Sequence, residues 1–222
     1  MSKIRIKAVV FDLDGLMFNT EDIFKQSNHE LVSRRGKRIS PELRQQMMGR
    51  RAHEAFQIMI DDLGLTESVE EIMVEEEKLF TGMLDEQLAP LPGMLDLLDH
   101  LEEACIPKAV ATSSGREYLH GILGRVGLLP RFHMTLAAED VENGKPHPEI
   151  YETAAQRLEI TTAEMMVLED SEAGTKAAAA AGAITVSVPT QHSRTHDFTT
   201  ATHIAESLAD PLIYRLLSRD YS

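Results

Sequence analysis

The sequence is poor in the residues that mark several classes of protein. Its 222 residues include a single cysteine, Cys105, so no disulfide can form within the chain, which fits a reducing compartment. No apolar run approaches the roughly 20 residues of a membrane span. Lysine and arginine are scarce, 22 against 36 aspartates and glutamates. No basic stripe offsets the net charge of −14, so we expect neither a membrane nor a nucleic acid as a partner.

The amino-terminal residues also lack the features of an export signal. The stretch MSKIRIKAVVFD passes from basic to strand-like apolar residues without a small-residue cleavage site, which predicts a cytoplasmic protein. An acidic protein that binds an anionic substrate needs local positive charge, and a bound cation is the simplest source.

The length and overall composition are those of a globular protein. A hydrophobic fraction of 43% and a charged fraction of 26% are ordinary for a soluble protein. The length allows one α/β domain with an insertion, or two modest domains.

The apolar pattern predicts a strand followed by a purely helical segment. Residues 7–12 are β-branched and aromatic, as in a buried strand. Helical spacing without any strand pattern then recurs over residues 22–35, 41–48, 53–63 and 69–84. These segments are separated by glycines at helix ends or turns, namely Gly36, Gly49 and Gly64. We therefore expect a helical domain inserted over residues 19–89.

Strands and helices alternate in the rest of the chain. We expect helices over residues 93–104, 115–126, 148–158 and 172–181. Strand patterns lie between them, over residues 107–112, 134–138, 165–168 and 184–188. This alternation favours right-handed βαβ units, and hence an α/β fold with a Rossmann-like parallel sheet. We expect this core to comprise residues 1–18 and 90–222, with a loop and a closing helix after Pro189.

Polar residues follow four of the predicted strands. They are Asp12 after the first strand, Thr112, Ser113 and Ser114 after the second, Lys145 in the loop after the third, and Glu169 and Asp170 at the end of the fourth. In an open parallel sheet, ligands bind at the carboxyl ends of the strands. The sequence therefore predicts a binding site at this edge of the sheet.

The chemistry of these groups suits a phosphate monoester. Asp12 and Asp170 offer the hard oxygen ligands that Mg²⁺ prefers. Asp12 could attack phosphorus to give an aspartyl-phosphate, and Asp14, two residues further on, could move protons as acid and then as base. Thr112 could donate to a phosphoryl oxygen, and Lys145 could stabilise its charge.

Each of these motifs has an ordinary structural explanation when it is taken alone. An Asp-x-Asp-Gly sequence is more often a turn, here with Gly15 permitting a tight exit from the strand. Lys145 could be a solvated loop residue, and Glu169 and Asp170 could cap the helix that follows. Their joint occurrence at successive strand ends favours the functional interpretation.

The segments FDLDG, VATSS, NGKPHPEIY and VLEDSEAG contain these residues and follow one another in this order. Together they resemble the four motifs of the haloacid dehalogenase superfamily of phosphotransferases, over essentially the whole chain. The resemblance implies that Asp12 is the nucleophile and Asp14 the acid and base. It also implies a Mg²⁺ ion held by the Asp12 carboxylate, the Asp14 main-chain carbonyl and Asp170, with Glu169 assisting directly or through water.

The helical insertion resembles the α-helical cap of the subfamily that includes β-phosphoglucomutase and many small-molecule phosphatases. Asn19 departs from that subfamily, whose members usually have aspartate at this position. We expect substrate contacts from Thr20, Arg50, Arg51, Ser113 and Ser114.

The resemblance favours a phosphatase that hydrolyses a small sugar or nucleoside phosphate. Dehalogenases lack the second aspartate, so Asp14 argues against carbon–halogen chemistry. A sugar-phosphate mutase is the alternative, although mutases have a histidine where Phe24 stands. An alternative of another class is a non-catalytic protein that accepts phosphate or binds a partner. We expect a monomer or a small homo-oligomer.

Overall fold

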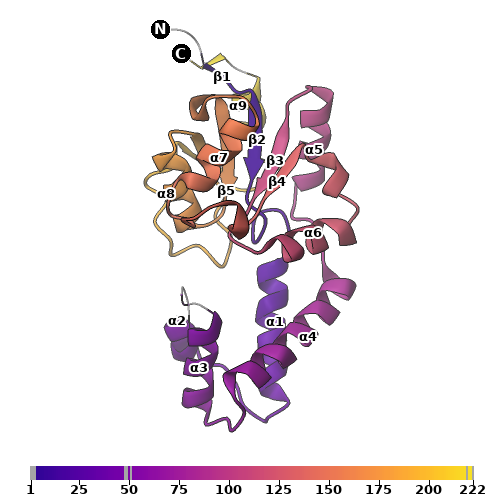
Figure 1. The fold of residues 1–222 in the computed structure, drawn as a ribbon, viewed down its shortest axis with the longest axis vertical. Coiled ribbons are helices and arrows are strands. Elements are labelled where there is room, and N and C mark those ends of the chain that lie inside the picture. The colour runs from indigo at the N-terminus through magenta and orange to yellow at the C-terminus, as the bar shows by residue number, and fades with distance from the viewer. Residues whose placement is uncertain (1–3, 48–49, 51, 219, 222) are drawn as a thin grey trace. The chain divides into compact units, whose positions relative to one another are not determined.

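The computed structural model describes residues 4–47, 50, 52–218 and 220–221 (Figure 1). The chain divides into two compact units, a core unit of residues 1–19 and 89–222 and a helical unit of residues 20–88. Each unit has its own cluster of buried apolar side chains. Gly49, predicted to end a helix, and Arg51, predicted to bind substrate, lie outside the described residues.

The core unit is built on one parallel sheet. Its strands follow the order β4 (Met134–Leu136), β3 (Lys108–Ala111), β2 (Ala8–Phe11), β5 (Met165–Glu169), β6 (Ile184–Ser187) and β7 (His203–Ile204). All neighbouring strands in it run parallel. The predicted α/β fold with a Rossmann-like sheet is therefore confirmed.

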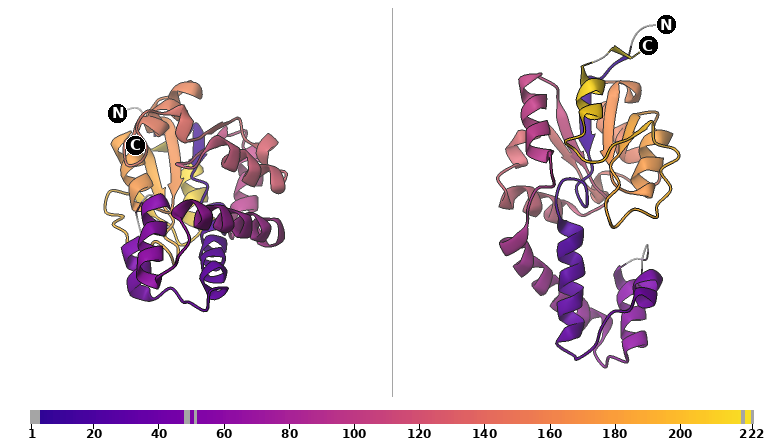
Figure 2. Two further views of the ribbon diagram at one scale, coloured as in Figure 1. Left: turned by 60° about the horizontal axis from the view of Figure 1, so that its bottom comes forward. Right: turned by 180° about the vertical axis from the view of Figure 1, so that it is seen from behind.

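Helices cover both faces of this sheet. Figures 1 and 2 show α5 (Met94–Glu103) and α6 (Arg116–Arg125) on one side of the strands, and α7 (Glu149–Arg157) and α8 (Glu172–Ala180) on the other. The small side chains of α8 pack with α7 against alternate residues of the strands. Val10 faces this side, and because strand side chains alternate, Val9 and Phe11 face the other. The central strands are fully buried, as their continuous apolar runs predict.

The structure differs from the sequence predictions mainly in short elements. The strand predicted over residues 134–138 ends at Leu136, because the Asp140 carboxylate accepts the Ala137 N–H and starts the 3₁₀ turn η2 (Ala138–Asp140). Two more 3₁₀ turns are η1 (Leu129–Arg131) and η3 (Thr162–Glu164). Strands β1 (Ile4–Arg5) and β8 (Asp220–Tyr221) form an antiparallel pair that was not predicted. The closing helix is α9 (Pro211–Leu217).

The helical unit contains α1 (Thr20–Ser33), α2 (Pro41–Met47), α3 (Ala52–Leu63) and α4 (Val69–Gln87). Apolar residues at helical spacing, among them Leu31, Phe56 and Ile72, bury its centre. Ser68 caps α4 by accepting the Glu71 N–H, while the Glu71 carboxylate accepts the Ser68 N–H.

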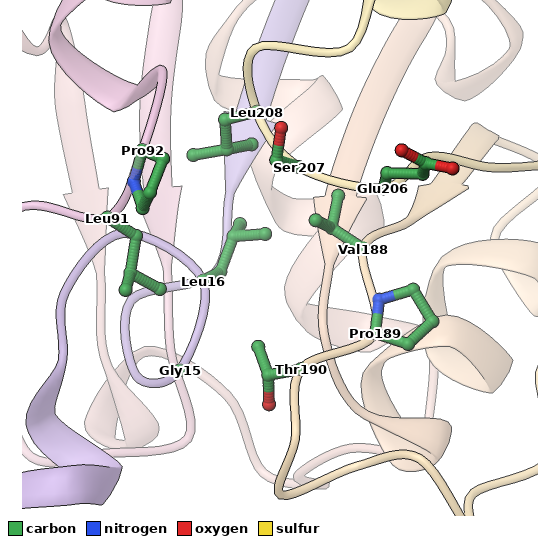
Figure 3. Close-up of a pocket in the computed structure, with 10 residues that line it drawn as sticks. All are labelled: Gly15, Leu16, Leu91, Pro92, Val188, Pro189, Thr190, Glu206, Ser207 and Leu208. Carbon is green, nitrogen blue, oxygen red and sulfur yellow. The ribbon is translucent and has the colours of Figure 1, made fainter.

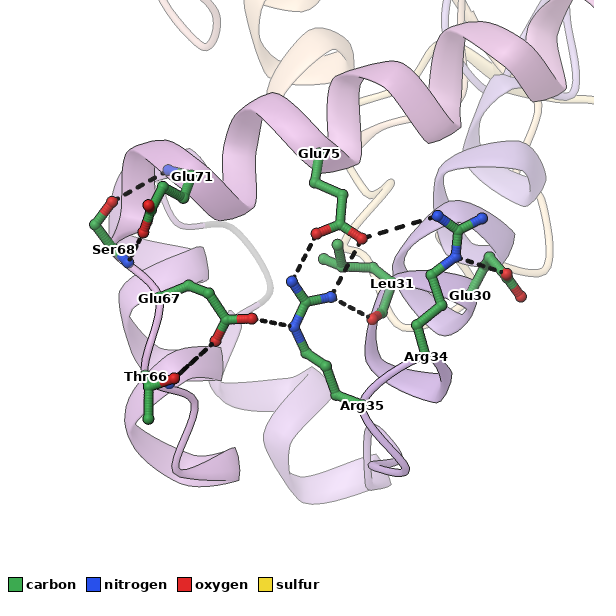
Figure 4. A network of polar contacts seen from close by, with 9 residues as sticks. All are labelled: Glu30, Leu31, Arg34, Arg35, Thr66, Glu67, Ser68, Glu71 and Glu75. Atoms are coloured by element: carbon green, nitrogen blue, oxygen red, sulfur yellow. Dashed lines mark hydrogen bonds and ion pairs between the residues drawn. The ribbon is translucent and has the colours of Figure 1, made fainter.

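Arg35 ties the end of α1 to α4 within this unit (Figure 4). Its guanidinium donates to Glu67 at 2.7 Å, to Glu75 at 2.6 Å and to the Leu31 carbonyl at 2.8 Å. The fork of a guanidinium suits several acceptors at once.

Among the described helices of both units, none combines the length and apolar character needed to cross a bilayer.

Candidate active site

The carboxyl ends of three adjacent strands bring the predicted residues together in the core unit. Strand β2 lies between β3 and β5, with Phe11 opposite Val110 on one side and Leu168 on the other. Asp12 directly follows β2, and its N–H donates to the Leu168 carbonyl at 3.0 Å. The predicted convergence of Asp12, Thr112 and Asp170 at one edge of the sheet follows from this register.

Three carboxylates form a buried acidic cluster at this edge. Asp12, Glu169 and Asp170 each place a carboxylate oxygen within 4.8 Å of the others. All three side chains are buried, Glu169 completely. Hard carboxylate oxygens at such spacing fit a Mg²⁺ ion, and like charges this close need a cation among them.

Lys145 supplies a positive charge inside this cluster. Its ammonium group donates to Asp12 at 2.5 Å, to Glu169 at 2.6 Å and to the Ala111 carbonyl at 2.9 Å. These three bonds match the three protons of the ammonium group. Burial alone would lower the pKa of Lys145, but Asp12 and Glu169 more than offset this and hold that pKa well above its usual range.

Asp12 lies in an environment that disfavours its charge. The pKa of Asp12 is raised to about 7, mainly by burial; Lys145 acts in the opposite direction, and the charges of Glu169 and Asp14 act in the same direction as burial. Further positive charge beside Asp12 would stabilise its ionised form, which is the form that can act as a nucleophile.

Asp14 lies two residues beyond Asp12 and is half-buried. Its carboxylate accepts hydrogen bonds from the Tyr118 hydroxyl at 2.7 Å and the Ser114 hydroxyl at 2.9 Å. Gly15, which follows, has a φ of 76°, a conformation that favours glycine. The predicted tight exit from the strand is therefore present.

The hydroxyl residues after β3 occupy different environments. Thr112 is buried, and its oxygen accepts the Ser114 N–H at 3.0 Å, which leaves its proton available for donation. Ser113 is exposed, and Ser114 is half-buried against Asp14. Thr112 and Ser114 therefore contact other site residues through side-chain hydrogen bonds, whereas Ser113 faces solvent.

A pocket of about 190 Å³ lies beside the turn after Asp14 (Figure 3). Its walls are mostly apolar and include Gly15, Leu16, Leu91 and Val188. None of the acidic or lysine side chains of the site lines it. The pocket therefore includes residues that follow Asp14 in sequence, but it does not include the side chains of the acidic cluster.

Of the predicted substrate residues of the helical unit, the structure describes Thr20 and Arg50. Thr20 is the first residue of α1, and its buried hydroxyl has no hydrogen-bond partner among the described residues. Arg50 is exposed.

A family model described as haloacid dehalogenase-like hydrolase matches residues 9–188. The chain belongs to this family. The resemblance inferred from the four motifs is confirmed, and the protein is an enzyme of the hydrolase class.

Two curated relatives are phosphatases at the same level of identity. A phosphorylated carbohydrates phosphatase of Thermotoga maritima is 30% identical, over 80% of this chain and 82% of that protein. The bifunctional riboflavin kinase/FMN phosphatase of Arabidopsis thaliana is also 30% identical, over 91% of this chain and 53% of that protein. The chain thus spans about half the length of this second relative.

Solved structures of the haloacid dehalogenase family have the same fold. A HAD family hydrolase from Deinococcus radiodurans, with bound phosphate and sodium, has a TM-score of 0.81 and 26% identity, and covers 97% of this chain and 96% of its own. A β-phosphoglucomutase from Clostridium difficile has a TM-score of 0.72 at 21% identity, over 96% of this chain and 97% of its own, which shows the shared fold alone.

Sequence reasoning missed three residues that hold the site together. The Tyr151 hydroxyl donates to Glu169 at 2.5 Å, and Lys145 lies 5.1 Å above the centre of the Tyr151 ring. Gly174 lies against the Glu169 carboxylate, where a β-carbon would overlap it. Tyr118 donates to Asp14. Tyr151 and Gly174 end the segments NGKPHPEIY and VLEDSEAG, whereas nothing in the sequence marks Tyr118.

Proposed function

We propose that this protein is a Mg²⁺-dependent phosphatase that hydrolyses a small sugar or nucleoside phosphate through an aspartyl-phosphate. The observation that carries the proposal is the Asp12 carboxylate, buried against Lys145 and the acidic pair Glu169–Asp170. The names of the two curated relatives, a phosphatase of phosphorylated carbohydrates and an FMN phosphatase, support this class of substrate.

The acidic cluster is the part of the site that fits the cation. Asp12, Asp170 and the Asp14 main-chain carbonyl would hold Mg²⁺, with Glu169 within reach. Bound there, Mg²⁺ would offset the repulsion between the carboxylates and an anionic ester. Glu169 already accepts bonds from Lys145, Tyr151 and Ser171, so its main contribution is to fix Lys145 beside Asp12.

The side chains then have defined tasks in two steps. A carboxylate oxygen of Asp12 forms a bond to phosphorus while the ester oxygen leaves with a proton from Asp14. Water next forms a bond to phosphorus and gives its proton to Asp14, and the bond from phosphorus to Asp12 breaks to release inorganic phosphate. Lys145 and the Thr112 hydroxyl stabilise the charge on the phosphoryl oxygens in both steps.

The helical unit would serve substrate selection as a cap. We propose that Thr20, Arg50 and Arg51 from this unit, with Ser113 and Ser114 from the core unit, contact the substrate. Closure of a cap excludes water during the first step. We propose further that the protein acts in the cytoplasm on a small-molecule ester, as a monomer or a small homo-oligomer.

The test is a screen of sugar phosphates and nucleoside monophosphates, with Mg²⁺ or with a chelator. We expect the wild type to release inorganic phosphate only with Mg²⁺, and Asp12→Asn to lose this activity by a factor on the order of 10³ or more. Turnover that survives Asp12→Asn would contradict the mechanism. Formation of an isomeric sugar phosphate in place of inorganic phosphate would indicate a mutase. A protein that binds phosphate but turns over none of the esters would indicate the non-catalytic alternative.

A further inference from the structure

Two hydroxyl groups hold the Asp14 carboxylate, one on each oxygen. Tyr118 donates to one oxygen at 2.7 Å and Ser114 to the other at 2.9 Å. Ser114 directly precedes Gly115, the residue that caps α6, and Tyr118 lies in the first turn of that helix. Both donors therefore come from the start of one element.

This start of α6 is itself firmly anchored. Leu119, Ile122 and Leu123 bury one face of the helix completely. The Arg116 N–H donates to the Glu139 carboxylate at 3.0 Å, and the Ser114 N–H donates to Thr112. The two hydroxyls are thus presented to Asp14 from a fixed position.

We propose that Tyr118 is a positioning residue for proton transfer by Asp14, an inference that rests on the proposed function. The last torsion of an aspartate side chain is broad, so an unrestrained carboxylate can rotate away from a reacting oxygen. One hydroxyl on each carboxylate oxygen fixes that torsion and leaves further lone pairs free for the proton that is transferred. The donors are neutral, so they fix the orientation without adding a charge.

A positioning role has a consequence that depends on the leaving group. An alkyl phosphate releases a strongly basic alkoxide and needs the proton of Asp14 as its ester bond breaks. The phenolate released from p-nitrophenyl phosphate is stable and leaves without a proton. Because kcat/KM reports the steps up to departure of the leaving group, it isolates this difference.

The experiment compares Tyr118→Phe with the wild type on p-nitrophenyl phosphate and on the fastest alkyl phosphate of the substrate screen. We expect Tyr118→Phe to lower kcat/KM for the alkyl ester about tenfold to a hundredfold, with p-nitrophenyl phosphate changed by about twofold or less. Ser114→Ala should act in the same direction, and Ser114→Thr, which keeps a hydroxyl, should recover much of the loss.

Tyr214→Phe is the matched control, because it removes the hydroxyl of another tyrosine of the core unit. Tyr214 lies on α9, and the centre of its ring is 5.0 Å from that of His100, which is not a residue of the site. It should leave both values of kcat/KM unchanged. Equal losses on the two esters in Tyr118→Phe, or no loss on the alkyl ester, would overturn the positioning role while the phosphatase stands. A wild type that hydrolyses neither ester would overturn the proposed function, and the inference with it.

Discussion

At the scale of single residues, Glu169 holds several side chains of the site in place through hydrogen bonds. It is completely buried, and its carboxylate accepts bonds from Lys145, Tyr151 and Ser171. A buried charge of this kind is stable only where it is paired and hydrogen-bonded. Burial, followed by the charge of Glu169, raises the pKa of Tyr151 well above its usual range, so Tyr151 remains a hydrogen-bond donor.

Gly174 provides the space that Glu169 occupies. A β-carbon at position 174 would overlap the carboxylate, which its three partners hold in place. We expect Gly174→Ala to lower the free energy of unfolding by about 1 to 3 kcal/mol, even though alanine favours helices. Displacement of Glu169 and Lys145 should also lower kcat by about a hundredfold. Urea denaturation and steady-state kinetics measure the two effects.

Gly82→Ala is the control for this substitution. Gly82 lies within α4, and a β-carbon there would meet no described atom within 4 Å beyond its chain neighbours and the backbone of its own helix. Alanine at this position should therefore stabilise the protein by about 0.5 to 1 kcal/mol. If Gly174→Ala also stabilised the protein and left kcat unchanged, Glu169 would have room to move, and its fixed position could not be important for activity.

At the scale of elements, α1 and α4 are joined by a buried polar contact. Ser27 on α1 lies 2.6 Å from the Glu76 carboxyl on α4 and 2.9 Å from the Phe24 carbonyl. The single proton of Ser27 cannot serve two acceptors fully, whereas a protonated Glu76 would supply a second proton. Burial raises the pKa of Glu76 and so favours the same protonated form.

This contact predicts a stability that depends on pH. Because the folded-state pKa of Glu76 is raised, its stabilising contribution is present below the unfolded-state pKa and is lost as pH rises through the folded-state pKa. Glutamine at position 76 cannot ionise. We expect Glu76→Gln to stabilise the protein, relative to the wild type, by on the order of 1 kcal/mol at about pH 8 and by less at about pH 5.

Urea denaturation at the two pH values measures this difference. Glu86→Gln, at an exposed position of the same helix, is the matched control and should stay within about 0.5 kcal/mol of the wild type at both pH values. A gain for Glu76→Gln that did not change with pH would show that ionisation of Glu76 is not its cause.

Elements could be predicted where many residues repeat one pattern. The helices α1 to α8 and the strands β2 to β6 all coincide with predicted segments, because each buries a regular apolar face. Strand β7 has two residues and no such pattern, and its edge position follows from pairing with β6 alone. The antiparallel pair β1 and β8 was missed for the same reason.

At the scale of the whole molecule, the net charge of −14 means that any cation can stabilise the fold by screening. Binding of Mg²⁺ at the acidic cluster must therefore be told apart from this general effect. A ligand that binds only the folded state stabilises it by about 2.7 kcal/mol when present at about 100 times its dissociation constant. We expect Mg²⁺ to raise the unfolding temperature of the wild type. Asp170→Asn, which removes one carboxylate of the acidic cluster, should lose most of that rise.

Sodium chloride at equal ionic strength separates this effect from general screening. Salt weakens the repulsion within an acidic protein wherever its charges lie, so it should raise the unfolding temperature of both proteins equally. Equal stabilisation of the wild type and Asp170→Asn by Mg²⁺ would place the bound ion away from the acidic cluster.

The sequence by itself determined the type of fold and the type of chemistry. Alternating apolar segments require a parallel sheet, and the polar residues that end those segments must then meet at one edge. Tertiary structure alone decided which partners fix the reactive groups. Lys145 is 133 positions from Asp12, and the sequence placed the two together only because both follow strands of one sheet. The contact of Tyr118 with Asp14, 104 positions away, depends on how α6 packs on the sheet, and no local pattern in the chain encodes it.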